Sequence, residues 1–445
     1  MHNDETLDQL LLMINQLREE NSWLKQENEF LKSQVSNLES RLAQYENAHT
    51  PPSLRRGVKR KQSHFESDKG TPGQKKGHLG QTRPLSKPDR VVDLTKDRCP
   101  DCGSKLGKPF NIESKIIEDI PEPQPISTTE YRIAHYICSR CHKEVTATDS
   151  LCPKEGRFGN NVIAQVALLK YEDRLPHRKI QNALKRHYGF TISPATILDL
   201  TRRAADAVQS DYEAILSRIR NAKILYVDET SIDVQGKNYW LWVFTTPIEA
   251  FVAIRYSRGT KVLNEVLTRR FKGTIVCDGW KPYAQFSKNL QRCWAHLLRE
   301  SKELTEKVPE AFSLHRELTG IYDRLNQALS SDPPPEVRRE LWIKERNVLR
   351  ELTKNKYKSE KVNKFIGKIS NGFEYWLTFV IQPDVEPTNN RAERAIREHV
   401  VQRKIIGTLR SEKGTSIHER IMTMVATWSI QGLNSLQMMR LKLGS

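Results

Sequence analysis

Three acidic residues that lie far apart in the sequence are the strongest candidates for chemistry. Asp228 and Asp278 each directly follow a short apolar run that reads as a buried strand, and Glu393 lies where the pattern predicts the first turns of a helix. Mg²⁺ prefers hard oxygen ligands. Two such ions held between carboxylates activate an attacking oxygen and stabilise a leaving one. The three acids therefore predict a two-metal site of the kind that acts on phosphodiester bonds.

Each of these acids also has an ordinary alternative role. An Asp at the end of a strand often forms a turn or caps a helix, and Glu393 could pair with Arg397 one helical turn later. Glu229 and Asp233 compete for the role of first ligand. Asp228 is preferred because it directly terminates the apolar run.

The predicted helix around Glu393 is rich in basic residues. A carboxylate among so many cations makes sense where a phosphate backbone approaches, although a solvated basic face would have the same sequence. The candidate DNA contacts in this region are Arg391, Arg394, Arg397, Arg403 and Lys404.

Composition favours a polyanionic partner. The 445 residues include 72 Lys and Arg against 54 Asp and Glu, a net charge of +18, and such an excess favours nucleic acid through counterion release. The length allows several domains with cores of their own. A long apolar run of the kind that spans a membrane is missing, and the polar, acidic N-terminus differs from a signal peptide. These features predict a cytoplasmic, nucleoid-associated protein without a membrane partner.

The first 50 residues carry a heptad pattern. Leu recurs at every seventh residue from Leu10 to Leu38, and Asn21 and Asn28 occupy the other core position. Leu at one core position with Asn at the other is typical of parallel two-stranded coiled coils. Residues 1–50 therefore predict a leucine zipper that forms a homodimer or a higher oligomer. A single amphipathic helix packed on its own domain is the alternative.

Residues 51–90 form a predicted basic, flexible linker. Pro51 and Pro52 end the preceding helix, and eleven Lys or Arg then stand against three acids. Such a segment can contact phosphates or can serve only as a solvated spacer. Its candidate DNA contacts are Arg55, Arg56, Lys59, Arg60 and Lys61.

Residues 91–152 contain two Cys-x-x-Cys pairs, Cys99 with Cys102 and Cys138 with Cys141. Two such turns can complete a tetrahedral site for one structural Zn²⁺, with strand-like segments at 114–120 and 131–137 between them. The pattern predicts a zinc ribbon, with chance pairing or a redox motif as the alternative. The cysteines Cys152, Cys277 and Cys293 read as ordinary buried residues.

Residues 156–215 predict short helices. Gly189 breaks one of them, and Ser193 followed by Pro194 begins the next. The pair resembles a helix-turn-helix that would offer Thr196, Arg202 and Arg203 to DNA. A helical packing subdomain explains the pattern equally well.

Residues 220–430 predict the catalytic core. Three strands, a helix near 260–267 and a further strand form the beginning of an RNase H-like α/β fold, with a charged helical insertion at about 297–382 and a short C-terminal region at 431–445. The predicted class is thus multidomain α+β: coiled coil, zinc ribbon, helix-turn-helix-like segment and interrupted RNase H-like core.

Four short motifs resemble those of bacterial insertion-sequence-66-type transposases. They are Asp228-Glu229-Thr230, Asp278-Gly279-Trp280, Cys293-Trp294-Ala295-His296 and the run from Asn389 to Arg397. The order of the modules is also similar, and the resemblance covers nearly the whole chain. The segment 405–409 departs from the aromatic-containing run that this family has after its Arg-Lys pair.

The resemblance implies a DDE transposase whose acids are Asp228, Asp278 and Glu393, with two Mg²⁺ or Mn²⁺ per active site. Its DNA partners would be the terminal repeats of the element and a target, with accessory proteins encoded by the element as further partners. Two rivals remain: a domesticated DNA-binding regulator without catalysis, and an RNase H-like nuclease that never joins strands. His296 and Arg299 could lie near the site or in the core.

Overall fold

The computed structural model describes residues 87–118, 122–149, 151–153 and 155–444, together with Asn21, Leu24, Lys25, Asn28, Glu29, Lys32 and Val35. It divides into two units, residues 1–121 and 122–445. The seven residues near the N-terminus are helical. The rest of the predicted zipper and linker residues 51–86, with Arg55, Arg56, Lys59, Arg60 and Lys61, lie outside the described residues.

The two cysteine pairs form turns with the same backbone hydrogen bonds. In the first unit, Cys99 N–H donates to the Ser104 carbonyl at 2.9 Å and Gly103 N–H donates to Cys99 at 3.0 Å. In the second unit, Cys138 N–H donates to Lys143 at 2.9 Å and His142 N–H to Cys138 at 2.8 Å.

Gly103 and His142 occupy the same position in these turns, and both have positive φ, 71° and 54°. The second turn joins β1 (His135–Ile137) to β2 (Glu144–Thr146), which pair antiparallel. The described residues 114–118 form no strand, and β1 covers only the end of the second predicted strand. Each pair thus has knuckle-like local geometry. The joint four-cysteine zinc site stays a prediction.

The predicted helical segment is confirmed as helices. It contains α2 (Asn160–Tyr171), α3 (His177–Tyr188), α4 (Pro194–Ala207) and α5 (Gln209–Arg220). Gly189 ends α3 with a left-handed φ of 61°, as the lack of a Cβ permits. The Ser193 hydroxyl accepts the Thr196 N–H at 3.1 Å and caps α4.

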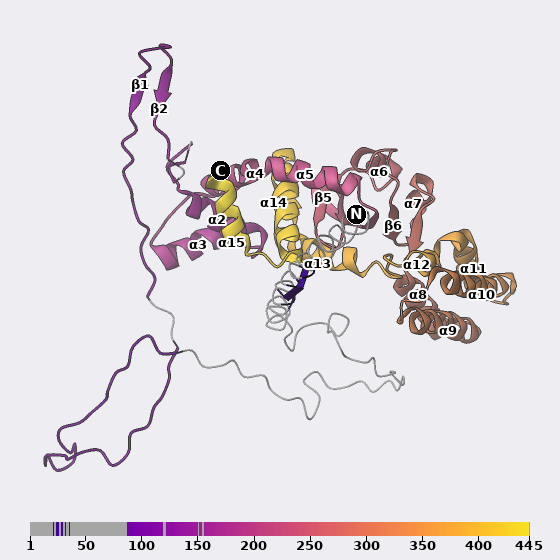
Figure 1. The fold of residues 1–445 in the computed structure, drawn as a ribbon, viewed down its shortest axis with the longest axis horizontal. Coiled ribbons are helices and arrows are strands. Elements are labelled where there is room, and N and C mark those ends of the chain that lie inside the picture. Colours follow the sequence, from indigo (N-terminus) through magenta and orange to yellow (C-terminus); the bar gives the residue numbers. More distant parts are fainter. Residues whose placement is uncertain are drawn as a thin grey trace, which may run out of the picture. The chain divides into compact units, whose positions relative to one another are not determined.

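The core is a mixed sheet in the order β5-β4-β3-β6-β7; Figure 1 labels β5 and β6. Strands β3 (Ile224–Val234), β4 (Lys237–Thr245) and β5 (Ala250–Arg255) pair antiparallel. Strands β6 (Thr274–Cys277) and β7 (Leu290–Arg292) continue parallel to β3, after α6 (Thr260–Val266) and α7 (Lys281–Phe286). This order is consistent with an RNase H-like core.

Strand β3 is longer than its apolar run predicts. It continues to Val234, because β4 pairs with its whole outer half from Asp228 to Val234 and the short β8 (Thr408–Leu409) pairs beside Asp233 and Val234. The expectation that Asp228 terminates the strand is therefore wrong, because hydrogen bonds to two neighbours hold the polar continuation extended. Asp278 does directly follow β6.

Helices cover the sheet on both faces. Alternate residues of a strand point to opposite sides, and Leu225 and Val227 belong to one buried cluster while Tyr226 belongs to the other. The first cluster also contains residues of α2, α4, α5 and α14 (Glu412–Ile430), so the helical segment shares a core with the sheet.

The second cluster is formed largely by the predicted helical insertion, which Figure 1 shows grouped together. Its elements are α8 (Trp294–Lys307), α9 (Ala311–Leu329), α10 (Pro335–Lys354), α11 (Glu360–Asn371), η2 (Phe373–Tyr375) and α12 (Thr378–Ile381). Helix α13 (Asn390–Ile406) follows the insertion, and α15 (Ser435–Gly444) ends the chain. Within the described residues, no helix has both the length and the apolar character of a membrane span.

Candidate active site

The pairing of β3 with β6 brings two of the predicted acids together. Tyr226 and Val276 are partners in this parallel register, and Asp228 and Asp278 each lie two residues further along the chain. Because side chains two apart on a strand share a face, both carboxylates lie on the side that carries Tyr226 and Val276. The register thus supports the two acids as neighbours at this edge of the sheet, and their role as metal ligands stays a prediction.

Asp228 is surrounded by other carboxylates. Burial is the main reason why its pKa is raised to about 7, and the charges of Glu229, Asp278 and Glu393 raise it further. The backbone N–H of Glu229 donates to Asp228 Oδ1 at 2.9 Å and opposes the shift. A cation would offset the burial and the neighbouring negative charges that raise the pKa of Asp228.

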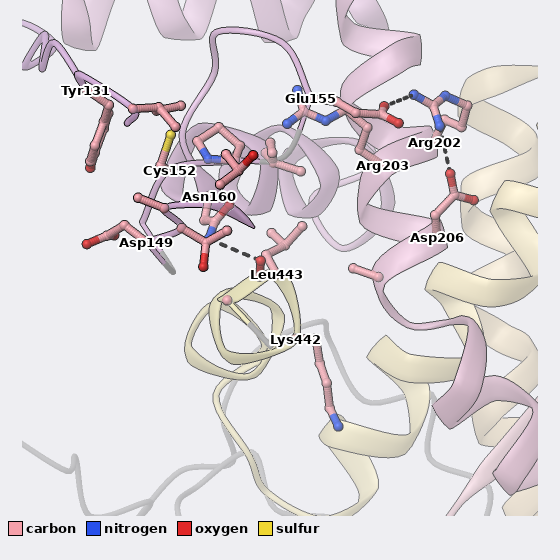
Figure 2. A pocket seen from close by; sticks show the side chains of 18 of the residues that line it. Tyr131, Asp149, Cys152, Glu155, Asn160, Arg202, Arg203, Asp206, Lys442 and Leu443 are labelled. Atoms are coloured by element: carbon pink, nitrogen blue, oxygen red, sulfur yellow. Dashed lines mark hydrogen bonds and ion pairs between the residues drawn. The ribbon is translucent and has the colours of Figure 1, made fainter. Parts of the chain in front are cut away.

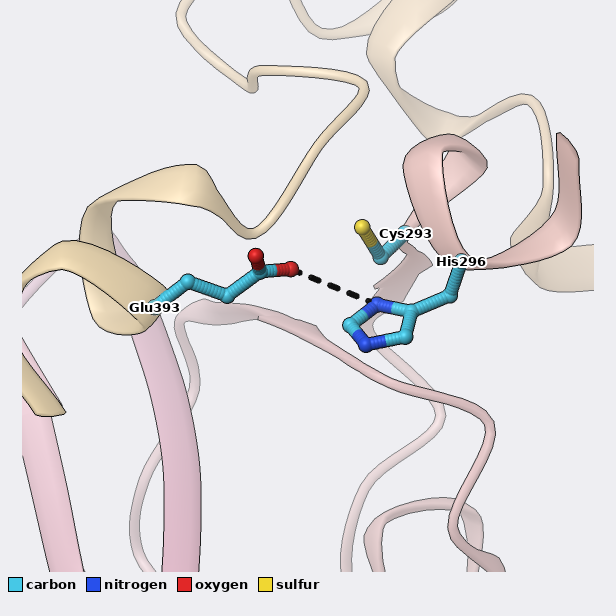
Figure 3. A group of neighbouring side chains, drawn as sticks. All are labelled: Cys293, His296 and Glu393. Atoms are coloured by element: carbon cyan, nitrogen blue, oxygen red, sulfur yellow. Dashed lines mark ion pairs between the residues drawn. The ribbon is translucent and has the colours of Figure 1, made fainter. Parts of the chain in front are cut away.

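Helix α13 supplies Glu393 on its first turn. Asn389, the residue before this helix, fixes its start. The Asn389 side-chain amide donates to the Val227 carbonyl at 2.8 Å. The backbone carbonyl of Asn389 accepts the N–H of Glu393 at 3.1 Å. Glu393 is thereby tied to the β3 residue that precedes Asp228. Figure 3 shows its carboxylate directed toward His296, with 3.4 Å between Oε1 and Nδ1.

The two competing acids have structural partners of their own. Buried Glu229 pairs with Arg258, Nε to Oε1 at 2.8 Å, and accepts the Tyr283 hydroxyl. Asp233 accepts the N–H of Gly236 at 3.1 Å and so closes the β3–β4 turn. These contacts favour Asp228 as the ligand on β3.

The donor set fits divalent metals. Asp228, Asp278 and Glu393 offer hard oxygens, and Glu393 Oε1 is buried without a hydrogen bond among the described residues. In the described part of the chain, only Cys293, His296 and Glu393 each offer one ligand atom within 4.8 Å of the other two, and the three carboxylates are not grouped at that spacing.

The basic residues of α13 differ in their contacts. Arg391 pairs with Glu386 at 2.6 Å, and Arg403 donates to the Thr230 hydroxyl of β3 at 2.8 Å. The exposed side chains of Arg394, Arg397 and Lys404 form no ion pair or hydrogen bond with any described residue. These three are therefore the cations that this helix leaves open to a phosphate.

Arg202 and Arg203 line a cavity of about 840 Å³ between the segment after β2, α4 and α15. Figure 2 shows Arg202 between Glu155 and Asp206, at 3.2 and 2.8 Å, and Asp199 also contacts it. Three carboxylates thus hold Arg202, whereas Thr196 bonds to Ser193. Arg202 can reach DNA only by exchanging these partners.

Sequence reasoning missed the role of Cys293 beside the acids and left the place of His296 open. Cys293 reads as an ordinary buried cysteine, but its sulfur accepts the N–H of Asn389 at 3.2 Å, and its own N–H donates to the Cys277 carbonyl at 2.9 Å. His296 lies beside Glu393 rather than in the core. The available signal was the Cys-x-x-His spacing at the start of a helix.

Comparison with known families agrees with this geometry. The model of the family described as "Transposase IS66 family" matches residues 155–417, more than half of the chain. The chain belongs to the IS66 family of transposases. The matched span contains Asp228, Asp278 and Glu393.

Two curated proteins of Sinorhizobium fredii (strain NBRC 101917 / NGR234) are similar to this IS66-family chain. "Uncharacterized protein y4qI" is 24% identical over 62% of the chain and 57% of its own length. "Uncharacterized protein y4hP" is 22% identical over 79% of the chain and 72% of its own length. The chain thus spans little more than half of the first relative.

Proposed function

We propose that this IS66-family protein is the transposase of an insertion sequence, with Asp228, Asp278 and Glu393 as its catalytic acids. The observation that carries the proposal is the parallel pairing of β3 with β6, because it supports two half-buried carboxylates side by side with Glu393 close by. The expected substrates are the terminal repeats of the element and a target DNA.

Asp228, Asp278 and Glu393 would together hold two Mg²⁺ or Mn²⁺ ions. When bound, the ions supply activation of the attacking oxygen and stabilisation of the leaving oxygen. The protein's own part is to hold the three carboxylates in place. Asn389 does so for Glu393 through Val227, and the peptide N–H of Trp280 does so for Asp278, donating to Oδ1 at 2.8 Å.

The reaction is expected in two stages at one site. Water cleaves at the end of the element and leaves a free 3′-hydroxyl, and this hydroxyl then attacks the target strand in a second in-line displacement. Exposed Arg394, Arg397 and Lys404 would contact the backbone of the DNA that enters beside Glu393. The zinc module and the α3–α4 segment would hold the terminal repeats, and the zipper would pair two protomers.

Asp278→Asn tests the assignment of the acids. Cleavage of a labelled terminal-repeat duplex in Mg²⁺ should fall at least about 100-fold, because even outer partners of metal ligands contribute 10–100-fold. Asp233→Asn removes a turn acid of the same sheet and is the matched control, with circular dichroism to verify folding of both. Cleavage by Asp278→Asn at the unaltered rate would refute the assignment.

Following the labelled ends into a target plasmid separates the remaining alternatives. Joined products indicate a transposase, whereas cleaved ends that never join indicate a nuclease. Sequence-specific binding without metal-dependent cleavage would instead indicate a regulator.

A further inference from the structure

Cys293, His296 and Glu393 form a second cluster of ligand atoms beside the acids. Cys293 precedes α8, His296 lies on its first turn, and Glu393 reaches them from α13 (Figure 3). One ligand atom from each lies within 4.8 Å of the other two. Two separate helices therefore bring a thiol, an imidazole and a carboxylate to one point.

Two atoms of this cluster lack hydrogen-bond partners. His296 Nδ1 and Glu393 Oε1 are both buried, and neither has a hydrogen bond within the described residues, although only 3.4 Å separates them. A buried polar atom without a partner costs about 1–3 kcal/mol. The two atoms face each other as the ion pair drawn in Figure 3, and a cation bound by both would take the place of that contact.

The spacing suits a tetrahedral ion. Zinc bonds of about 2.0–2.3 Å place neighbouring ligand atoms about 3.4–3.6 Å apart, and the pair from His296 and Glu393 already has this separation. The sulfur of Cys293 needs at most a rotamer-scale approach to complete the set. Three protein ligands leave a fourth position for water, as in open zinc sites.

The surroundings of Cys293 act on its thiol in opposite directions. Burial, and less strongly the charge of Glu393, raises the pKa of the thiol. The N–H of Asn389, which donates to the sulfur at 3.2 Å, and the N-terminus of a 14-residue helix favour the thiolate, and a bound cation would offset the cost of ionising it. Sulfur and imidazole select Zn²⁺ and related transition metals over Mg²⁺. The cluster therefore differs in metal preference from the all-carboxylate site next to it.

We propose that Cys293, His296 and Glu393 form a binding site for a thiophilic divalent cation, Zn²⁺ in particular. The Cys293 thiol releases its proton to solvent on binding, and neutral His296 binds through Nδ1. If the proposed transposase function is correct, Zn²⁺ bound here competes for Glu393 with the ions held by Asp228 and Asp278. Occupancy would then inhibit Mg²⁺-dependent cleavage.

The test measures zinc binding by the full-length chain. The wild-type protein, His296→Gln and Cys293→Ser are incubated with ZnCl₂ in excess Mg²⁺ and desalted, and bound zinc is measured by mass spectrometry. The wild type should retain one equivalent more than either variant, whatever the cysteine pairs of the zinc module hold. Cobalt substitution should give a thiolate-to-cobalt charge-transfer band that is weaker in Cys293→Ser.

Matched controls are His315→Gln, a half-buried histidine of α9, and Cys277→Ser, a buried cysteine of β6. Both should retain the wild-type amount of zinc. His296→Gln decides the matter if Cys293→Ser fails to fold, because the His296 side chain is 37% exposed. Equal zinc content in the wild type and His296→Gln would overturn the proposal.

A second measurement addresses inhibition. Micromolar Zn²⁺ should lower the rate of Mg²⁺-supported cleavage by the wild type. The rate of each variant with Zn²⁺ is compared with its own rate without Zn²⁺. The cleavage rate of His296→Gln should fall by a smaller factor than that of the wild type. A protein that never cleaves DNA would refute the proposed function and leave the zinc count valid. Equal inhibition of the wild type and His296→Gln by Zn²⁺ would refute the proposal that Zn²⁺ inhibits cleavage by competing for Glu393.

Discussion

Adjacent residues of one strand carry acids with opposite tasks. Asp228 points to the face that holds Asp278 and Glu393, and its pKa is raised to about 7 by burial, then by the charge of the adjacent Glu229 and, less strongly, by Asp278 and Glu393. Glu229 points to the other face, where Arg258 and the Tyr283 hydroxyl satisfy it. Because side chains alternate along a β-strand, Asp228 faces the proposed metal site, whereas Glu229 is paired within the fold.

Substitution of these two neighbours should change stability in opposite directions. Without divalent metal at neutral pH, Asp228→Asn should raise the free energy of unfolding by up to about 4 kcal/mol, because a buried, crowded charge is removed. Burial raises the pKa of Glu229 as well, so the informative change is Glu229→Leu, which should lower the free energy of unfolding by about 2–3 kcal/mol because it leaves Arg258 and Tyr283 without their shared acceptor. Chemical unfolding in EDTA measures both.

The sign of the stability change in Asp228→Asn decides between the two roles of this carboxylate. Added Mg²⁺ should stabilise the wild type and should stabilise Asp228→Asn much less, since the variant lacks a ligand. If Asp228→Asn were less stable than the wild type in EDTA, the Asp228 carboxylate would have a stabilising structural partner, and repulsion by neighbouring acids would not dominate.

At the scale of elements, helix α14 closes the open edge of the sheet. Thr427 accepts the N–H of Ala250 at 3.1 Å, Thr423 that of Val252 at 2.9 Å, and Glu419 that of Ile254. Residues four apart on a helix rise about 6 Å, and residues two apart on a strand span about 6.6 Å. Because these two spacings are nearly equal, one helix can accept the free N–H groups of three alternate residues of β5. Helix α14 thereby protects this edge from pairing with another strand.

Thr423→Val should therefore destabilise the protein by about 1–3 kcal/mol, the cost of an unpaired buried N–H. Valine keeps the shape of threonine, and Thr423→Ser keeps the hydroxyl and serves as the control. Hydrogen exchange should show faster exchange at the Val252 amide in Thr423→Val. Unaltered protection of that amide would show that the capping contact contributes nothing.

Two buried histidines join α13 to α14. The rings of His399 and His418 lie 5.8 Å apart, and burial lowers the pKa of His399 to about 4. The pKa of His418 is lowered by burial and then by the charges of His399 and Lys170. The ring of Tyr171 packs against His418 from α2. Both histidines are therefore neutral in the folded protein at neutral pH.

A lowered pKa means that the unfolded chain takes up the proton first. The contribution of His399 to stability is present above about pH 6.5, falls as the pH drops toward 4, and is constant below that value. The loss should be about 3 kcal/mol. His399→Gln should flatten this part of the unfolding curve, measured against pH, whereas exposed His187→Gln should leave it unaltered.

At the scale of the whole molecule, the sequence predicted the positions of those strands and helices that depend on a local pattern of residues. Apolar runs located β3 and β6, caps located α3 and α4, and the long charged stretch located the insertion before Glu393. The far half of β3 could not be predicted, because polar residues there are held by pairing with β4 and β8. Nor could the place of Cys293 and His296, since their neighbour Glu393 is remote in sequence.

The last prediction concerns assembly, which the heptads of the first 50 residues specify. Lysine at the seam positions Leu24 and Leu31 should dissociate the chain into monomers, because two buried charges per helix cannot pair across the seam. Lysine at Gln26 and Ser33, on the outer side of the same turns, adds the same charge and should leave the dimer intact. Sedimentation equilibrium measures both.

The consequence for activity separates assembly from chemistry. The monomeric variant should still bind a single terminal repeat, since the sheet and α13 are untouched, but it should form no complex with two repeats. Joining of two ends into one target should therefore be lost, as gel-shift and strand-transfer assays with two differently labelled ends would reveal. A monomer that joins paired ends as well as the wild type would refute a dimeric transposition complex built on this zipper.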